Sequence, residues 1–178
     1  MNPTPTGYYR DGRIVIERAL AFGTGEVWDA LTASERTARW IGPWAGDPST
    51  GTIDLTMTAE EGSPTMTLRI DECESPVRAA VSAGEGDEVW TLFGEVRSAG
   101  EGEVGSVIAL SQVIDDPEKA SAIGPGWEFY LDRLVAAETG ADPEAIDFDD
   151  YYPSMADYYR ALPGQIRTNT TEPRTRIG

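Results

Sequence analysis

The order of apolar and polar positions changes character several times along the chain, and each change predicts a new element. Residues 13–22 (RIVIERALAF) form a strand-length run of β-branched and apolar side chains that stops at Gly23. Thr24 and Ser34 stand where helix caps are expected, ahead of segments 25–31 and 34–40. The pattern therefore predicts a strand followed by two short helices.

From about residue 50 onward the apolar positions alternate with polar ones, as in a strand with one buried face. Segments 53–57 and 66–70 have this period of two, and three further strand-length runs follow at 77–83, 88–97 and 104–114. Glycine-rich turns separate the later runs. This stretch predicts a meander of antiparallel strands.

The segment after the last strand has the spacing of a helix with one apolar face. Asp116-Pro117 is typical of a helix start, but Gly124-Pro125-Gly126 interrupts the path. We therefore expect a short turn and then a main helix over 125–139, stopped by Gly140. The apolar positions on the helical face are Ile123, Trp127, Tyr130, Leu131 and Leu134.

These elements divide the chain into four parts. Residues 1–12 read as a lead-in and 13–140 as one α+β domain, in a length that suits a single core. Residues 141–163 are acidic and aromatic, and we expect them to dock on the domain. Residues 164–178 are polar, with almost no apolar side chains, and we expect a flexible tail.

Two separated segments resemble a known family. Residues 16–43 (IERALAFGTGEVWDALTASERTARWIGP) resemble the opening of proteins related to the activator of the heat-shock protein 90 ATPase, within the START-like (SRPBCC) superfamily. Residues 124–134 (GPGWEFYLDRL) look like the family's glycine-tryptophan motif at the start of the long C-terminal helix. The resemblance implies a helix-grip fold, in which a curved antiparallel sheet of about six strands wraps that helix.

In the resembling family, sheet and helix enclose an apolar cavity that holds lipids, hormones or polyketides in various relatives. Many relatives have a histidine near the end of the last strand, in the stretch that corresponds to 110–114, where this chain has Gln112 instead. A buried Gln112 could orient an oxygen of a ligand or pair with a backbone group at the strand end. Both interpretations stay open from the sequence.

The amino-acid composition restricts which metals, cofactors and partners we expect for this protein. The chain has no histidine, and Cys73 is its single cysteine, so we expect no disulfide, no metal site and no cofactor. A formal charge of −17 disfavours nucleic acid and anionic membranes as partners. Without a membrane-spanning stretch or a secretory signal, the sequence predicts a cytoplasmic protein.

The candidate ligand-binding residues are the apolar side chains expected to face inward, together with the amide on the last strand. For any single apolar one, core packing is the commoner role of such a position. The set comprises Trp40, Trp44, Met57, Met66, Leu68, Trp90, Leu92, Leu110, Gln112, Trp127, Tyr130, Leu131 and Leu134.

Three functions are compatible with these sequence features. We favour a binding protein for a small hydrophobic or aromatic molecule over an enzyme, and we name no catalytic residue. The alternative is a protein-interaction module related to the chaperone-ATPase activators, with a protein partner or a second copy of the chain as a homodimer. The third is a cyclase or aromatase, in which proton transfer would fall to Tyr130, Glu95 or Asp132.

Overall fold

The alternating segments pair into a single antiparallel sheet. In the computed structural model, which describes residues 3–165, the strands have the spatial order β1-β2-β8-β7-β6-β5-β4-β3. The strands are β1 (Tyr8–Arg10), β2 (Arg13–Leu20), β3 (Trp44–Ala45), β4 (Thr52–Thr56), β5 (Thr65–Glu74), β6 (Arg78–Ala83), β7 (Trp90–Ser98) and β8 (Ser106–Val113). The chain crosses from β2 to the opposite edge at β3 and returns through a meander, so that the last strand pairs with β2.

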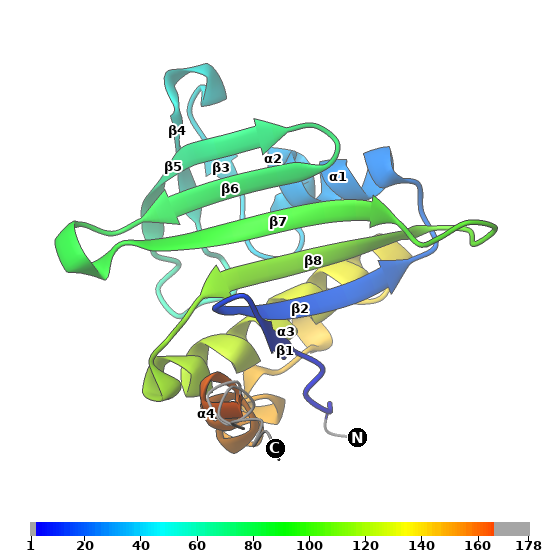
Figure 1. Ribbon diagram of the computed structural model, residues 1–178. Helices are drawn as coiled ribbons and strands as arrows, with labels where there is room; N and C mark the ends of the chain where they lie inside the picture. The colour runs from blue at the N-terminus through cyan, green and yellow to red at the C-terminus, as the bar shows by residue number, and fades with distance from the viewer. Residues whose placement is uncertain (1–2, 166–178) are drawn as a thin grey trace, which may run out of the picture.

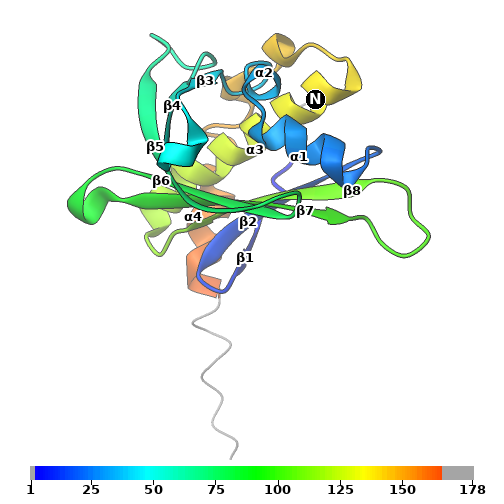
Figure 2. The same cartoon turned by 90° about the horizontal axis from the view of Figure 1, so that it is seen from above.

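The helices lie on one face of this sheet. The crossover contains α1 (Thr24–Thr32) and α2 (Ser34–Thr37), and α3 (Pro117–Thr139) follows the last strand. Figures 1 and 2 show these three helices on the same side of the sheet, whose β3–β5 edge curls toward them. The core therefore lies between the inner face of the sheet and α3, as the helix-grip prediction requires.

The strand register decides which side chains reach that core. Gln112 of β8 stands opposite Ile14 of β2 and Leu92 of β7, so these three side chains belong to one face of the sheet. Ile108 and Leu110 precede Gln112 at intervals of two and are buried on the same face.

The sheet has eight strands rather than about six. One addition, β1, lies inside the predicted lead-in of residues 1–12 and pairs with β2 from Tyr8 opposite Val15. Asp11 and Gly12 both have positive φ, of 51° and 78°, which is the geometry of a tight hairpin turn. The second addition, β3, has two residues and pairs with β4 at the far edge.

The long helix is also longer than predicted, because α3 begins at Pro117 and runs through the glycine-proline-glycine sequence without a break. The reason is tertiary packing. Gly124 lies against the ring of Tyr159, and a Cβ at Gly124 would stand 2.1 Å from Tyr159 Cδ1. The glycine is therefore required by a close approach between helices rather than by a turn.

The segment after α3 returns along the helix. It forms two short 3-10 turns, Pro143–Ala145 and Phe148–Asp150, and then α4 (Ala156–Gln165), which packs beside α3 and β1. Tyr151, Met155, Tyr159 and Leu162 are buried in the core cluster. The predicted tail begins inside α4, since that helix includes Gly164, and residues 166–178 lie outside the described part of the chain.

Candidate ligand cavity

A cavity of about 270 Å³ lies between the meander and the first half of α3. Its walls are almost entirely apolar. The lining residues are Ile41, Leu55, Met57, Glu60, Met66, Leu68, Val81, Trp90, Leu92, Gln112, Ile123, Gly126, Trp127 and Tyr130. The predicted candidates among them are Met57, Met66, Leu68, Trp90, Leu92, Gln112, Trp127 and Tyr130. The structure thus brings together residues from the strands β4 to β8, from the turns that follow α2 and β4, and from α3.

Two hydrogen bonds fix the polar groups of the cavity wall. The Trp127 indole N–H donates to Gln112 Oε1 over 2.8 Å, which ties α3 to β8. The Tyr130 hydroxyl donates to Glu60 Oε1 over 3.0 Å, and Glu60 lies in the exposed turn between β4 and β5. Burial, with the nearby Glu60 carboxylate adding to it, raises the pKa of Tyr130 well above its usual value. Tyr130 therefore stays a neutral donor at the cavity wall.

A second cavity of about 250 Å³ lies next to the first, under the crossover. The two cavities share the walls formed by Ile41, Leu55, Leu68, Val81 and Leu92. The second cavity contains the remaining tryptophan candidates, Trp40 and Trp44, in its lining.

The rings of these two tryptophans are held by backbone partners. Trp40 Nε1 donates to the Ala30 carbonyl and Trp44 Nε1 to the Thr32 carbonyl, each over 2.9 Å. Ser34 was expected to cap a helix, but Ala33 takes the cap position and the Ser34 hydroxyl bonds both backbone groups of Trp44. The indole N–H groups are thus satisfied within the protein, and only ring surface faces this second cavity.

Three predicted candidates lie outside both cavities. Leu110, Leu131 and Leu134 are at most 1% exposed and belong to the packed core. Leu131 is turned away from Tyr130 by about 100° around the helix axis. Leu134 lies about one full helical turn beyond Tyr130, past the end of the cavity lining. These leucines belong to the same apolar runs of the sequence as the lining residues, so their position in the fold was needed to separate the two sets.

The structure adds residues that the sequence prediction missed. Leu55 and Val81 follow the alternation of the strands, and Ile123 belongs to the apolar helical face already named, so these three could have been found from the sequence. Ile41 lies in the turn after α2 and follows neither pattern. Glu60 and Gly126 give no such signal. Glu60 reaches the cavity from a turn, and Gly126 contributes bare helix backbone to the wall.

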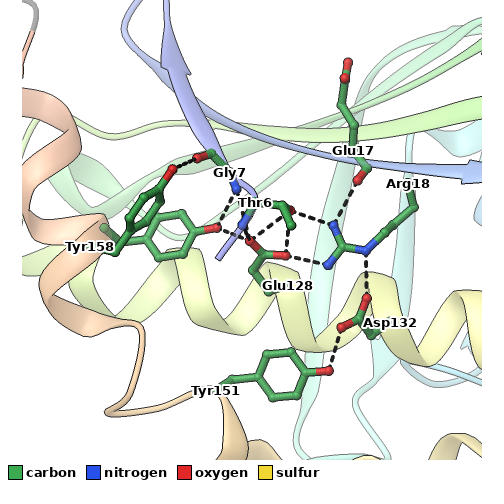
Figure 3. A network of polar contacts seen from close by, with 9 residues as sticks. Thr6, Gly7, Glu17, Arg18, Glu128, Asp132, Tyr151 and Tyr158 are labelled. Carbon is green, nitrogen blue, oxygen red and sulfur yellow. Dashed lines mark hydrogen bonds and ion pairs between the residues drawn. The ribbon is translucent and has the colours of Figure 1, made fainter. Parts of the chain in front are cut away.

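Behind α3, on the side away from the cavity, lies a polar network that the sequence did not reveal (Figure 3). Glu128 has a fully buried side chain and accepts hydrogen bonds from the backbone N–H of Thr6 and Gly7, over 2.5 and 3.0 Å. It also accepts from the Tyr159 hydroxyl and forms an ion pair with Arg18. Burial alone would raise the pKa of Glu128, but these hydrogen bonds and the Arg18 charge outweigh it and lower the pKa.

The same network includes Asp132, one turn further along α3. Arg18 Nε donates to Asp132 over 2.7 Å, and the Tyr151 hydroxyl donates to its other oxygen over 2.6 Å. Figure 3 shows Arg18 between the two α3 carboxylates, with the N-terminal segment above them. The network joins β2, α3 and the two terminal segments.

This arrangement bears on the acid–base candidates for an enzyme. Asp132 is bound in the network away from the cavity, and Glu95 is exposed on β7. Among residues 3–165, the ionisable groups that line the cavity are Glu60 and Tyr130. No group of three aspartate, glutamate or cysteine side chains in this range could hold a metal ion, and no helix in it combines the length and apolar character needed to span a bilayer.

Known structures share this architecture. The crystal structure of CalU16 from Micromonospora echinospora matches with a TM-score of 0.67 at 24% sequence identity, over 85% of this chain and 88% of CalU16. EF2215 of Enterococcus faecalis, a conserved protein of unknown function, matches with a TM-score of 0.60 at 17% identity, over 94% and 92% of the two chains. DynU16, a protein in the dynemicin biosynthetic locus, matches with a TM-score of 0.61 at 19% identity, over 75% of this chain but 50% of DynU16.

At these identities the likeness establishes the fold, which is the helix-grip architecture. No family model matches the chain, and no curated protein matches it significantly. The closer resemblance to the chaperone-ATPase activators therefore stays a prediction.

Proposed function

We propose that the protein binds a small hydrophobic or aromatic molecule in the cavity between the sheet and α3. The observation that carries the proposal is the open apolar volume of about 270 Å³, in a protein whose neighbouring core leucines are fully buried. An apolar molecule gains free energy by leaving water for such a space, at about 25 cal/mol for each Å² of surface removed. The volume is at the lower end of the usual ~300–1,000 Å³ for ligand pockets, so we expect a ligand of about two fused rings.

The related structures support this proposal at the level of fold. DynU16 has the same architecture and comes from the dynemicin biosynthetic locus, a setting in which small molecules are made. Fold alone does not assign a function, so the cavity and its residues must be tested directly.

Gly126 offers the sharpest test, because it lines the cavity and a Cβ added to it would meet no atom within 4 Å. Gly126→Leu should fill part of the cavity without displacing the fold. We expect it to weaken binding of the neutral probe β-acetylnaphthalene at least tenfold. Binding is followed through the tryptophan indole N–H signals in nitrogen–proton NMR spectra, since Trp90 and Trp127 line the cavity.

The matched control is Gly25→Leu, in α1, where an added Cβ also meets no atom within 4 Å but the site is exposed. This variant should bind the probe as the wild type does. If the wild type binds no neutral naphthalene at all, or if Gly126→Leu binds it unchanged, the cavity is not a ligand site.

A second candidate function is binding of a protein partner through the C-terminal extension. Phe148 and Tyr152 stack there with ring centroids 6.1 Å apart and are 40% and 41% exposed. If the extension binds a chaperone ATPase, the protein should stimulate ATP hydrolysis by heat-shock protein 90. Phe148→Ser should then abolish the stimulation while leaving probe binding in the cavity intact.

A further inference from the structure

The inference concerns the ligand that the cavity selects, and it rests on the proposed function. We infer that the ligand is a neutral, flat apolar molecule with a carbonyl-type oxygen, and that this oxygen accepts a hydrogen bond from the side-chain amide of Gln112.

Gln112 is 6% exposed and lies on the inner face of β8, between Ile14 and Leu92 of the neighbouring strands. Its Oε1 accepts from Trp127 Nε1. An indole nitrogen can only donate, so this bond fixes the orientation of the amide with its oxygen toward Trp127. The Nε2 group, which carries two donor hydrogens, must then lie on the other side of Cδ, turned away from the Trp127 indole N–H.

The Nε2 group has no hydrogen-bond acceptor among residues 3–165, although Gln112 is part of the cavity wall. Two buried polar side chains nearby have partners. Arg133 donates to the carbonyls of Trp40 and Pro143, and the indole N–H of Trp40 also has a backbone partner. Nε2 is not sealed from solvent, since Ser82 Oγ is the one sealed-off polar side-chain atom without a partner among the described residues, so an acceptor oxygen on a bound ligand would take the place of water at this donor.

The negative charge beside the cavity also restricts the ligand. The Glu60 carboxylate lies at the wall and is bound by the Tyr130 hydroxyl, in a chain with a formal charge of −17. A ligand carrying its own negative charge would be repelled from this site, whereas a neutral ketone would not. The cavity therefore favours an oxygen that accepts a hydrogen bond without being ionised.

Two probes of nearly the same shape test the inference. β-Acetylnaphthalene carries a C=O group where β-isopropenylnaphthalene carries C=CH₂, so they differ in the acceptor oxygen. The wild type should bind the ketone about fivefold to tenfold more tightly than the alkene, which corresponds to one net hydrogen bond. In the NMR spectra, the ketone should move the side-chain amide protons of Gln112 downfield relative to their position in the alkene complex, because the ring current of the naphthalene is common to both complexes.

The variant Gln112→Met keeps the length of the side chain but removes the amide. Its preference for the ketone should fall to within about twofold. Ile123→Ala is the matched control, since it changes the cavity wall on α3 but leaves in place both the Gln112 amide and the indole that orients it. It should weaken both probes by a similar factor and keep the ketone preference.

The outcomes separate the inference from the function on which it rests. If both probes bind the wild type equally, or if Gln112→Met keeps the ketone preference, Gln112 does not select the ligand and the inference is wrong, while the cavity remains a binding site. If neither probe binds, the proposed function fails together with the inference. Should Gln112→Met not fold, the shift of the Gln112 amide protons in the wild type by itself tests whether this amide donates a hydrogen bond to the ketone. An unchanged position relative to the alkene complex would overturn the inference.

Discussion

Trp127 and Tyr130 of α3 border an open cavity, whereas Glu128, on another side of the same helix, is completely enclosed. The cavity side has few polar groups and keeps an amide donor without a partner among the described residues. On the enclosed side a buried carboxylate is surrounded by hydrogen-bond donors from β2, the N-terminal segment and α4. A fully paired polar network holds the helix in place, and this allows the opposite side to stay incompletely packed.

The contrast is sharpest at two glycines two residues apart in α3. Gly124→Ala should lower the free energy of unfolding by about 3 kcal/mol, because the new Cβ would collide with the ring of Tyr159 and force α4 to move. Gly126→Ala, facing the cavity, should be neutral or stabilising by about 0.5–1 kcal/mol through its higher helix propensity. Urea denaturation measures both, and equal stabilities would mean that α4 does not rest on Gly124.

Removing the charge from the enclosed side should have the next largest effect. Glu128→Gln should lower the free energy of unfolding by about 2 kcal/mol, because Arg18 loses one of its two carboxylate partners and the hydrogen bonds to the side chain weaken. Glu118→Gln is the control, since Glu118 pairs with Arg160 at the surface and should leave stability essentially unchanged. If the two variants lose the same stability, the buried network does not support the fold.

The network should also make the protein sensitive to acid. The pKa of Glu128 is lower in the folded state than in the unfolded chain, so its contribution is present above the ordinary carboxyl pKa of ~4.3. This contribution is lost as the pH falls through the lowered pKa of the folded state. Below about pH 4.3, the wild type should therefore lose stability more steeply than Glu128→Gln does, as measured by thermal unfolding across this range. Parallel curves would assign the acid sensitivity to other carboxylates.

The smallest effect on stability is expected on the cavity side. Gln112→Met without ligand should change the free energy of unfolding by less than about 1 kcal/mol, because the loss of the bond to Trp127 is offset by the burial of a more apolar side chain. The comparison with Glu128→Gln, in the same denaturation experiment, separates a residue kept for the fold from one that acts on the ligand. A loss as large as that of Glu128→Gln would place Gln112 among the structural residues.

Local patterns predicted the strands and much of the cavity wall. The alternation at 53–57 and 66–70 places Met57, Met66 and Leu68 on the inner face. Met66 and Leu68 pair with β4 in this register, and Met57, just past the end of β4, lines the same cavity. The helical spacing after residue 116 likewise put Trp127 and Tyr130 on one face of a helix. These features depend on the period of side chains along one element, which the sequence states directly.

Long-range contacts decided the rest. The absence of a side chain at Gly124 of α3 is required by Tyr159, which lies far along the chain, and the pairing of Glu128 depends on Thr6 and Arg18 near its start. Leu110, Leu131 and Leu134 could be told from the lining residues only once their position in the fold was known.

The sequence by itself determined the element types, the acidic charge and the absence of histidine and paired cysteines. The tertiary structure decided which inward-facing residues border open space and which polar groups find partners. The physical reason is that periodicity is a property of neighbours along the chain, whereas a cavity or a buried hydrogen bond exists only where distant segments meet.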